Sequence, residues 1–371
     1  MNKTFVAISI LLGTIIGAGV LGIPYVFMRS GFSLGMLNLL IVGFIVALCQ
    51  LYLGEITLRT KDFKHLSGYA SKYLGKKGKY LMFLALVIGI YGAILAYLVG
   101  VSESLSFMIY SDLTHSLYLG IAFWLFMSIL SYQTLKALEK GETLGIALIG
   151  VLIVSISVMF WNKIDISNLQ YATLPNLFIP FGVVLFAFMG FSTVPEVARV
   201  LKNDKHSFKK SIIWTNIIVF IIYAIFAAIV LGVQGAKTPE IATLALGKPF
   251  ILLGILTMFT SYLALSVAFM DNLRFDFYLK KSKAWFITIA IPLILFIIVE
   301  LTNSSSFTKI LGIGGVLSGG LTAILILFMI KSAKKSGDRK PEYSIPYSSI
   351  LTGVLILIFT AGAVLEILNT I

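Results

Sequence analysis

Residue types that build many active sites are scarce in this chain of 371 residues. It has a single cysteine, and its three histidines all fall between hydrophobic runs. This scarcity excludes a disulfide framework and a metal cluster built on cysteine and histidine. Charged residues are also few, at 12%, whereas hydrophobic residues make up 58%. A chain of this composition is a membrane protein rather than a soluble globular domain.

Long hydrophobic runs dominate the sequence instead. A helix needs about 20 residues to cross roughly 30 Å of hydrocarbon, and eleven segments reach this length. We therefore predict an all-α membrane protein with eleven transmembrane helices, at residues 5–28, 33–58, 81–108, 117–135, 143–161, 177–197, 212–232, 250–273, 284–301, 307–330 and 347–368.

The net charge of +13 is distributed unevenly over the predicted connections. Lysine and arginine concentrate on the cytoplasmic side of membrane proteins. With a cytoplasmic N-terminus and alternating spans, the other side receives only Arg29, Lys163, Lys237, Lys248 and Lys309 of the 29 basic residues. We predict a multi-pass protein of the cell membrane with an extracellular C-terminus. The basic charge then serves topology and attraction to anionic lipid, and it requires no nucleic-acid partner.

The first span contains a stretch that disfavours a continuous helix. Residues 13–24 read GTIIGAGVLGIP, with four glycines and one proline. Inside a helix, glycine costs about 1 kcal/mol and proline about 3 kcal/mol relative to alanine. Irregular backbone at membrane depth is tolerated only where it is buried in protein or lines a cavity. We interpret the stretch as a helix break that forms half of a binding site.

A second interruption is predicted in the sixth span. Gly190, Ser192 and Thr193 lie in mid-span, shortly before Pro195. By the alternation above, this span runs in the opposite direction to the first. Two broken helices of opposite direction, five spans apart, are typical of inverted-repeat secondary transporters with a site at the midplane. The alternative is that these small residues only mediate helix packing.

Three motifs give the chain a resemblance to a known family. They are GTIIGAGVLGIP at 13–24 with GF at 31–32, VPEV at 194–197, and TSYLALS at 260–266 followed by Asp271. The sequence resembles the amino acid/auxin permease branch of the amino acid/polyamine/organocation superfamily. Within that branch it is most similar to the prokaryotic permeases for aromatic and hydroxy amino acids. The resemblance covers all eleven spans in order.

The resemblance implies a five-plus-five inverted repeat of the leucine-transporter type, with discontinuous helices 1 and 6. The first repeat would comprise residues 1–161, and the second, inverted repeat residues 162–331. A linker and one additional helix would occupy residues 332–371.

An amino acid substrate carries two charges, and both must be satisfied away from water. The amides at the start of a half-helix suit a carboxylate, and the carbonyls freed at the end of the other half suit an ammonium group. We place the carboxylate on the backbone of Gly17, Ala18 and Gly19. The ammonium group would meet carbonyls near Thr14, Ile15, Phe188 and Met189. The hydroxyls of Thr14 and Ser192 would add contacts, or they would bond back to their own helices.

The resemblance also maps a cation site. Thr257, Thr260 and Ser261 share one face of the eighth span by their spacing. The resemblance implies that Thr260 and Ser261, with a carbonyl of the first-span break at Ile16, enclose a cation. Oxygen ligands suit sodium, so Na⁺ is the one ion expected and no other cofactor is. The alternative is hydroxyl bonding between helices.

Carboxylates inside predicted spans are candidates for function. Glu196, in the inner half of the sixth span, is the candidate proton carrier or gate, with Arg199 one helical turn away as a partner. The alternative role for Glu196 is a salt bridge that holds the cytoplasmic gate. Glu55, Glu300 and Glu366 lie near span ends, where we expect them to be solvated.

A short amphipathic helix is predicted between the second and third spans. In residues 61–79 the apolar side chains recur at helical spacing among lysines: they are Phe63, Leu66, Tyr69, Ala70 and Tyr73. Such a helix would lie at the cytoplasmic surface of the membrane. An ordered loop is the alternative.

The leading prediction is a secondary active transporter that moves a neutral L-amino acid by alternating access. Its transport would be coupled to a sodium or a proton gradient. The alternative is an amino acid sensor that uses the same pocket without appreciable transport. We do not expect an enzyme, because no His/Glu cluster and no Ser/His pair falls within the spans.

Overall fold

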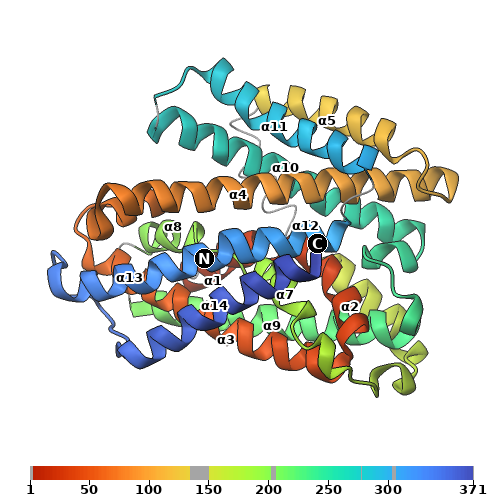
Figure 1. Cartoon of the computed structure of the whole chain (residues 1–371), viewed down its shortest axis with the longest axis horizontal. Helices are drawn as coiled ribbons and strands as arrows, with labels where there is room; N and C mark the ends of the chain where they lie inside the picture. The colour runs from red at the N-terminus through yellow and green to blue at the C-terminus, as the bar shows by residue number, and fades with distance from the viewer. Residues whose placement is uncertain (1–2, 134–149, 202–205, 277, 303–305, 371) are drawn as a thin grey trace.

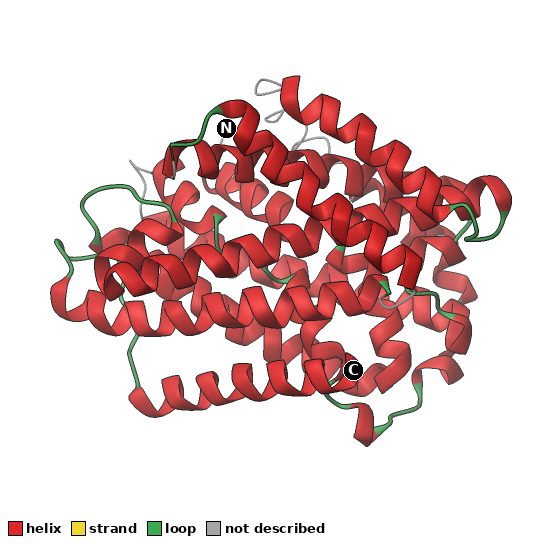
Figure 2. Ribbon diagram, turned by 45° about the horizontal axis from the view of Figure 1, so that its top comes forward, coloured by secondary structure: helices red, strands yellow, loops and turns green. Residues whose placement is uncertain are grey.

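The computed structural model describes residues 3–133, 150–201, 206–276, 278–302 and 306–370. Within these residues all regular structure is helical and no strand occurs (Figure 2). The predicted all-α class is confirmed.

The long helices follow the hydrophobic runs of the sequence. Their bounds are α1 Lys3–Ile15, α2 Gly19–Ser30, α3 Phe32–Arg59, α4 Leu66–Tyr110, α5 Ser116–Gln133, α7 Ile179–Ala187, α8 Thr193–Val200, α9 His206–Gln234, α10 Lys248–Asp276, α11 Lys281–Thr302, α12 Phe307–Gly314, α13 Leu321–Ser336 and α14 Ser349–Thr370. The π-helix η6 (Gly315–Gly320) joins α12 to α13. Residues 150–160 are also helical. Five 3-10 helices are described as well, namely η1 Trp161–Lys163, η2 Ile166–Leu169, η3 Leu174–Asn176, η4 Gly235–Lys237 and η5 Ala242–Ala245.

Among the described residues, up to eight candidate spans are long and apolar enough to cross a membrane. Seven are single helices, and the eighth is the pair α1 and α2, which is bent by 59°. Three shorter apolar helices, Ser116–Tyr132, Gly150–Lys163 and Leu174–Ala187, overlap the fourth, fifth and sixth predicted spans. The first residues of the fifth predicted span, 143–149, lie outside the described part of the chain.

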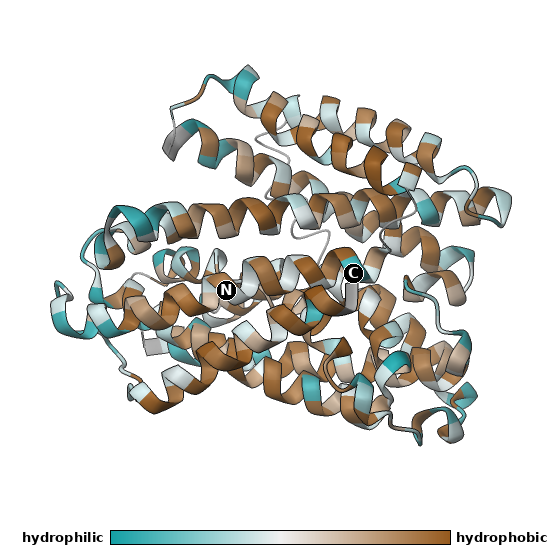
Figure 3. Cartoon of the chain, viewed as in Figure 1, coloured by the Kyte–Doolittle hydropathy of each residue, from teal (hydrophilic) through white to brown (hydrophobic). Residues whose placement is uncertain are grey.

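The helices form two groups, and α4, which crosses the middle of the view in Figure 1, belongs to the first. One group contains α4, α5, α10 and α11, and the other contains the broken spans α1/α2 and α7/α8 together with α3 and α9. The helix formed by α12, η6 and α13 contacts both groups. Hydrophobic residues cover the helix bodies, and hydrophilic residues gather at their ends (Figure 3).

The predicted amphipathic helix is confirmed from Leu66 onward, whereas residues 61–65 are not helical. Its apolar side chains at Leu66, Tyr69 and Tyr73 are buried. The helix joins the third span through a kink at Gly75, whose φ of 75° and ψ of −166° are not helical. A positive φ is accessible to glycine without steric cost, so the surface helix and the membrane span can meet at an angle.

The expectation that Glu55 is solvated is wrong. Its side chain is fully buried at the end of α3 and accepts hydrogen bonds from Arg59 Nε at 2.8 Å, Lys334 Nζ at 2.7 Å and the Ile345 amide at 2.7 Å. Ser344 Oγ donates to the same carboxylate at 2.9 Å. Because a buried charge must be paired, Glu55 fixes the connection between α13 and α14 (residues 337–348) to α3.

The expectation for Glu366 is wrong for the same reason. Glu366 is only 9% exposed to solvent. A Cβ added at Gly182 of α7 or at Gly312 of α12 would overlap the Glu366 carboxylate. The two glycines therefore leave room for this side chain, and α14 is held against both helices. Glu300, the third of these residues, is half-buried near the end of α11.

Candidate functional site

Both predicted breaks are present. In the first span the helix is interrupted only over residues 16–18, which is narrower than the glycine-rich stretch 13–24. In the second it is interrupted over residues 188–192. Pro195 lies in the first turn of α8, where a missing N–H costs no helical hydrogen bond.

The two breaks lie against each other with their spans antiparallel. α1 contacts α8, and α2 contacts α7. Thr193 Oγ1 donates to Thr14 Oγ1 at 2.9 Å, which joins the second break to the first. A Cβ added at Gly19 would lie 2.8 Å from the Cα of Ala187. The backbones of α2 and α7 therefore touch at this point, and a larger residue at position 19 would push them apart.

Each break contains the amides that begin a half-helix. Some of them bond to carbonyls of the break, since the Leu21 amide donates to the Ala18 carbonyl at 3.0 Å and the Val194 amide to the Phe191 carbonyl at 3.3 Å. The N-cap residues are Ala18 for α2 and Ser192 for α8, and neither makes a side-chain capping hydrogen bond to a described residue. The first N–H groups of a helix have no partner within the helix. Together with the helix dipole they favour a negative group. This geometry suits a carboxylate.

Each break also frees carbonyl groups, and one buried tyrosine of α9 connects them. Tyr223 is fully buried, and its hydroxyl donates to the Ile15 carbonyl at 3.2 Å and to the Ala187 carbonyl at 2.8 Å. These are the last residues of α1 and α7. The Ile15 carbonyl also accepts the Gly17 amide at 3.1 Å. A carbonyl oxygen has two lone pairs, so the Ala187 oxygen retains capacity for a second donor.

A pair of buried amides supports the second break. Gln50 Nε2 of α3 donates to the Phe188 carbonyl at 3.4 Å, and Asn216 Nδ2 of α9 donates to Gln50 Oε1 at 2.7 Å. The sequence reasoning missed Gln50, Asn216 and Tyr223. The available signal was that polar side chains inside apolar spans usually have a function.

Of the two candidate cation residues on α10, Ser261 lies beside the first break. A Cβ added at Gly17 would lie 3.4 Å from the Tyr97 hydroxyl and 3.9 Å from Ser261 Oγ, and these two hydroxyls interact with each other. Thr260 Oγ1 donates to the Thr257 carbonyl at 2.9 Å, a bond within its own helix. The amide of Ile16 donates to the Leu12 carbonyl at 2.8 Å.

The remaining predicted residues differ in exposure. Thr14 and Ser192 are exposed, Gly17 and Met189 are half-buried, and the side chain of Phe188 is buried. Thr14 Oγ1 also donates to the Ile10 carbonyl at 3.1 Å. The Thr14 hydroxyl therefore bonds back to its own helix.

Glu196 lies on the exposed face of α8. The guanidinium of Arg199 lies 5.7 Å from the centre of the Phe63 ring. The end of α8 therefore touches the segment that precedes α4. Among the described residues, no three histidine, cysteine, aspartate or glutamate side chains are arranged to hold a metal ion.

The apolar helices are those of a multi-pass membrane protein. Its two helix breaks face each other and bring main-chain amides and carbonyls together inside the helix bundle. The chain belongs to the tryptophan/tyrosine permease family, whose model matches residues 1–368. This is a family of amino acid transporters, and the resemblance inferred from the motifs is confirmed.

Several curated proteins are similar to the chain. Glutamine transporter 2 of Aliivibrio fischeri is 23% identical over 354 residues, which cover 90% of each chain. Amino acid transporter AVT3B of Arabidopsis thaliana is 25% identical over 66% of this chain and 63% of its own length. Tyrosine-specific transport system 1 of Haemophilus influenzae is 24% identical over 61% of this chain and 57% of its own. Because these relatives are transporters, the expectation that the chain is not an enzyme is confirmed.

Proposed function

We propose that the chain is a secondary active transporter that moves a neutral L-amino acid by alternating access. The proposal includes eleven spans in a five-plus-five inverted repeat with one additional helix, α14. The grouping of the helices supports it. In each half of the chain, the broken span and the helix that follows it belong to one group: these are α1/α2 with α3, and α7/α8 with α9. The next two helices of each half form the second group: these are α4 with α5, and α10 with α11.

The observation that carries the proposal is the meeting of the two breaks. Tyr223 contacts the carbonyl ends of α1 and α7 at once, and the uncapped amides of α2 and α8 begin within a few residues of those ends. A zwitterion requires an anion-binding and a cation-binding pole close together. The substrate carboxylate would bind at Gly17, Ala18 and Gly19, and the ammonium group at carbonyls of the two breaks.

Neutral substrates are favoured by the side chains around the first break. Tyr97 and Ser261, the neighbours of Gly17, are uncharged hydroxyl groups. The names of the family and of two relatives mention tryptophan, tyrosine and glutamine, all of which are neutral at pH 7. We therefore expect a substrate with a neutral side chain.

The coupling ion divides the proposal into two versions. In the sodium version, Thr260, Ser261 and the Ile16 carbonyl hold Na⁺ next to the substrate. In the proton version, Glu196 carries the proton on the exposed face of α8. The two versions differ in which gradient drives uptake and in which variant loses coupling.

The proposed orientation places the N-terminus in the cytoplasm. The basic ends of α3, α8 and α13 then face the cytoplasm. This orientation would correspond to a state that is closed toward the outside. The tight packing of α2 and α7 and the exposure of Thr14 and Ser192 on the α1 and α8 side support this proposal.

The test is uptake of radiolabelled amino acids by the full chain in liposomes, with sodium and proton gradients imposed separately. Gly17→Leu should lose uptake, because its side chain would fill the space between the first break and the Tyr97 and Ser261 hydroxyls. The matched control is Gly353→Leu in α14, where an added Cβ meets no described atom within 4 Å. Normal uptake by Gly17→Leu would overturn the site, and binding without any flux in the unaltered chain would favour the sensor.

A further inference from the structure

A buried carboxylate of α14 lies at the start of α7, the first half-helix of the second broken span. Glu366 is buried, and the Gly182 amide of α7 donates a hydrogen bond to its carboxylate. An acidic side chain inside a membrane protein is costly and is usually functional. Neither the proposed substrate site nor the proposed cation site uses this residue.

Two glycines provide the space for the Glu366 carboxylate. A Cβ added at Gly182 would lie 2.8 Å from Glu366 Oε2, and a Cβ added at Gly312 of α12 would overlap Glu366 Oε1. The same Cβ at Gly182 would lie 2.8 Å from the Gly312 Cα. The backbones of α7 and α12 therefore meet at this carboxylate, and an alanine at either position would displace it.

The helix that holds the carboxylate also ends at the second break. The Ala187 carbonyl at the end of α7 accepts the Tyr223 hydroxyl. At 1.5 Å per residue, the helix from Gly182 to Ala187 is only about 7.5 Å long. A movement of α7 at the break therefore also changes its contact with Glu366.

The position of α7 and the protonation of Glu366 are coupled for this reason. Burial disfavours the charged form of a carboxylate, whereas a hydrogen bond from the start of a helix favours it. Both effects change when α7 moves away, because the carboxylate then loses the Gly182 amide and gains water. Such coupling is reciprocal, so a proton bound at Glu366 also shifts the position of α7.

The helices packed against α14 differ in the charged groups that they bring to this place. α14 contacts α7, η6, α12 and α13, and the sequences of α7 and η6 contain no charged residue. α12 contributes Lys309, which is exposed one turn before Gly312. The lysines of α13 lie in its last turns, at Lys331, Lys334 and Lys335. Glu366 is itself the only charged residue of α14.

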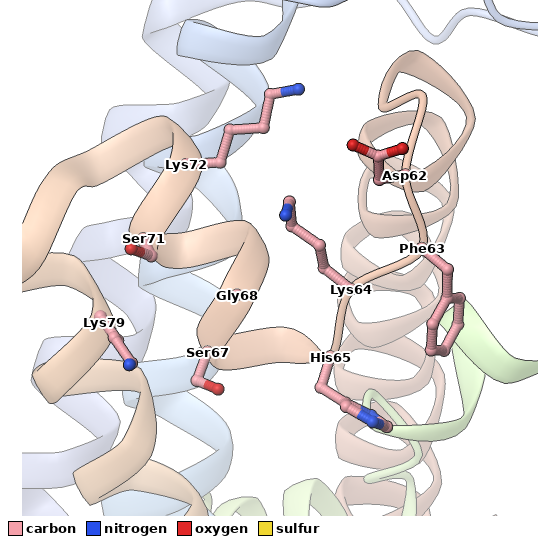
Figure 4. Close-up of a pocket in the computed structure, with 9 residues that line it drawn as sticks. All are labelled: Asp62, Phe63, Lys64, His65, Ser67, Gly68, Ser71, Lys72 and Lys79. Carbon is pink, nitrogen blue, oxygen red and sulfur yellow. The ribbon is translucent and has the colours of Figure 1, made fainter. Parts of the chain in front are cut away.

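Asp62 offers the contrast of a carboxylate in contact with solvent. It precedes α4, is exposed, and lines a pocket of about 580 Å³ (Figure 4). Figure 4 shows two other residues of this pocket, Lys64 and Lys79, on opposite sides of the first turn of α4. A helix movement changes the surroundings of an exposed carboxylate little, so Asp62 is the reference for Glu366.

We propose that Glu366 binds the proton that couples transport to a proton gradient, and that it acts through the position of α7. The proposal rests on the proposed function and on its orientation, in which the C-terminal end of α14 faces the outside. Glu196 of α8 lies on the other side of the second break. The broken span then has one carboxylate on each side, and Glu366 receives the proton from the outside.

The first test compares Glu366→Gln with the unaltered chain in liposomes. Glutamine has nearly the same size and can still accept the Gly182 amide, but it cannot ionise. We expect Glu366→Gln to exchange external for internal amino acid, and to lose both accumulation driven by a proton gradient and the dependence of uptake on external pH. Asp62→Asn is the matched control and should keep both.

The second test uses the unaltered chain and requires no variant to fold. Dicyclohexylcarbodiimide is an apolar reagent that modifies protonated carboxyl groups. Mass spectrometry of the purified full chain should find the modification at Glu366, in an amount that decreases as the pH rises.

Two results would overturn the proposal. One is a Glu366→Gln variant that accumulates amino acid with the proton gradient and pH profile of the unaltered chain. The other is an unaltered chain in which Glu366 is never modified at any pH at which the protein stays folded. Uptake driven by sodium alone would reject proton coupling through Glu366 and leave the proposed function intact. pH-dependent modification of Glu366 in a chain that transports nothing would reject the proposed function and leave proton binding intact.

Discussion

The two ends of each broken span differ in how the protein covers them. α2 is buried along most of its length, whereas α1 buries only Ala7, Leu11 and Ile15. The same contrast holds in the second span, where α7 is largely buried, whereas Glu196 and Arg199 of α8 and its N-cap residue Ser192 are exposed. The breaks thus lie at the boundary between a tightly packed side, formed by α2 and α7, and an accessible side, formed by α1 and α8.

This difference follows from the side chains available on each side. On the packed side small residues let helices touch at backbone distance, as Gly19 does against Ala187. On the accessible side α8 carries charged and hydroxyl groups on one face, and burying them would require partners. A transporter must be able to exchange these two arrangements, so the contacts that differ between the sides should control its cycle.

The largest effect is expected where the packed side has least room. Gly19→Val would force α2 away from α7, since the added Cβ already lies 2.8 Å from Ala187 Cα. Overpacking of this kind costs about 1–3 kcal/mol of unfolding free energy, and the thermal midpoint of the purified protein should fall accordingly. Gly17→Ala on the accessible side is the control, because its Cβ would make only an ordinary 3.4 Å contact with Tyr97. Equal midpoints for the two variants would remove the distinction between the sides.

An intermediate effect is expected at the residue that joins the two sides. Tyr223→Phe removes the hydroxyl that contacts both Ile15 and Ala187, and the loss of a buried hydrogen bond costs about 1 kcal/mol. We expect weaker amino acid binding with a smaller change in maximal rate, measured in liposomes.

The matched control is Tyr262→Phe in α10. Its hydroxyl is buried without a hydrogen-bond partner in the described part of the chain. This variant should be as stable as the unaltered protein or more so. If the two variants behave alike, Tyr223 does not hold the carbonyls in place.

The smallest effect concerns the connection between α13 and α14. The Lys61 amide, followed by the Lys72 ammonium group, lowers the pKa of Asp338 below its ordinary value. The stabilisation is therefore present above the pKa of the unfolded chain, about 4, and is lost as the pH falls through the lower folded-state value. Asp338→Asn should lower the thermal midpoint slightly at neutral pH, and the difference from the unaltered chain should vanish in acid. A difference that persists in acid would mean that the Asp338 charge is not the cause.

The sequence predicted where the spans break but not how far each break extends. Glycine and proline are weak local signals, and packing overrides them at Gly22 and Pro24, which lie inside α2. A Cβ added at Gly22 would lie 3.1 Å from Leu311 and 3.3 Å from Val183, which is closer than ordinary contact, so close tertiary packing surrounds this helical turn.

The contacts that support the breaks were not predictable from the sequence, because the two partners of each contact are distant in the chain. Gln50 meets Phe188 across 138 residues, and Tyr223 meets Ile15 across 208. The burial of Glu55 has the same origin, since Lys334 and Ser344 are supplied by the other end of the chain. Position near a span end predicts solvation only when nothing else folds over that end.

The most direct test of the two-sided arrangement is the reactivity of a cysteine placed at the second break. Cys49, the only native cysteine, is buried, so Ser192→Cys can be modified by a water-soluble thiol reagent against a low background. Ser336→Cys, exposed at the end of α13, controls for general access from the same side. We predict that both react, and that a transported amino acid slows the reaction at position 192 alone. An unreactive Ser192→Cys, or one that no transported amino acid protects, would contradict the assignment of the two breaks as an accessible substrate site.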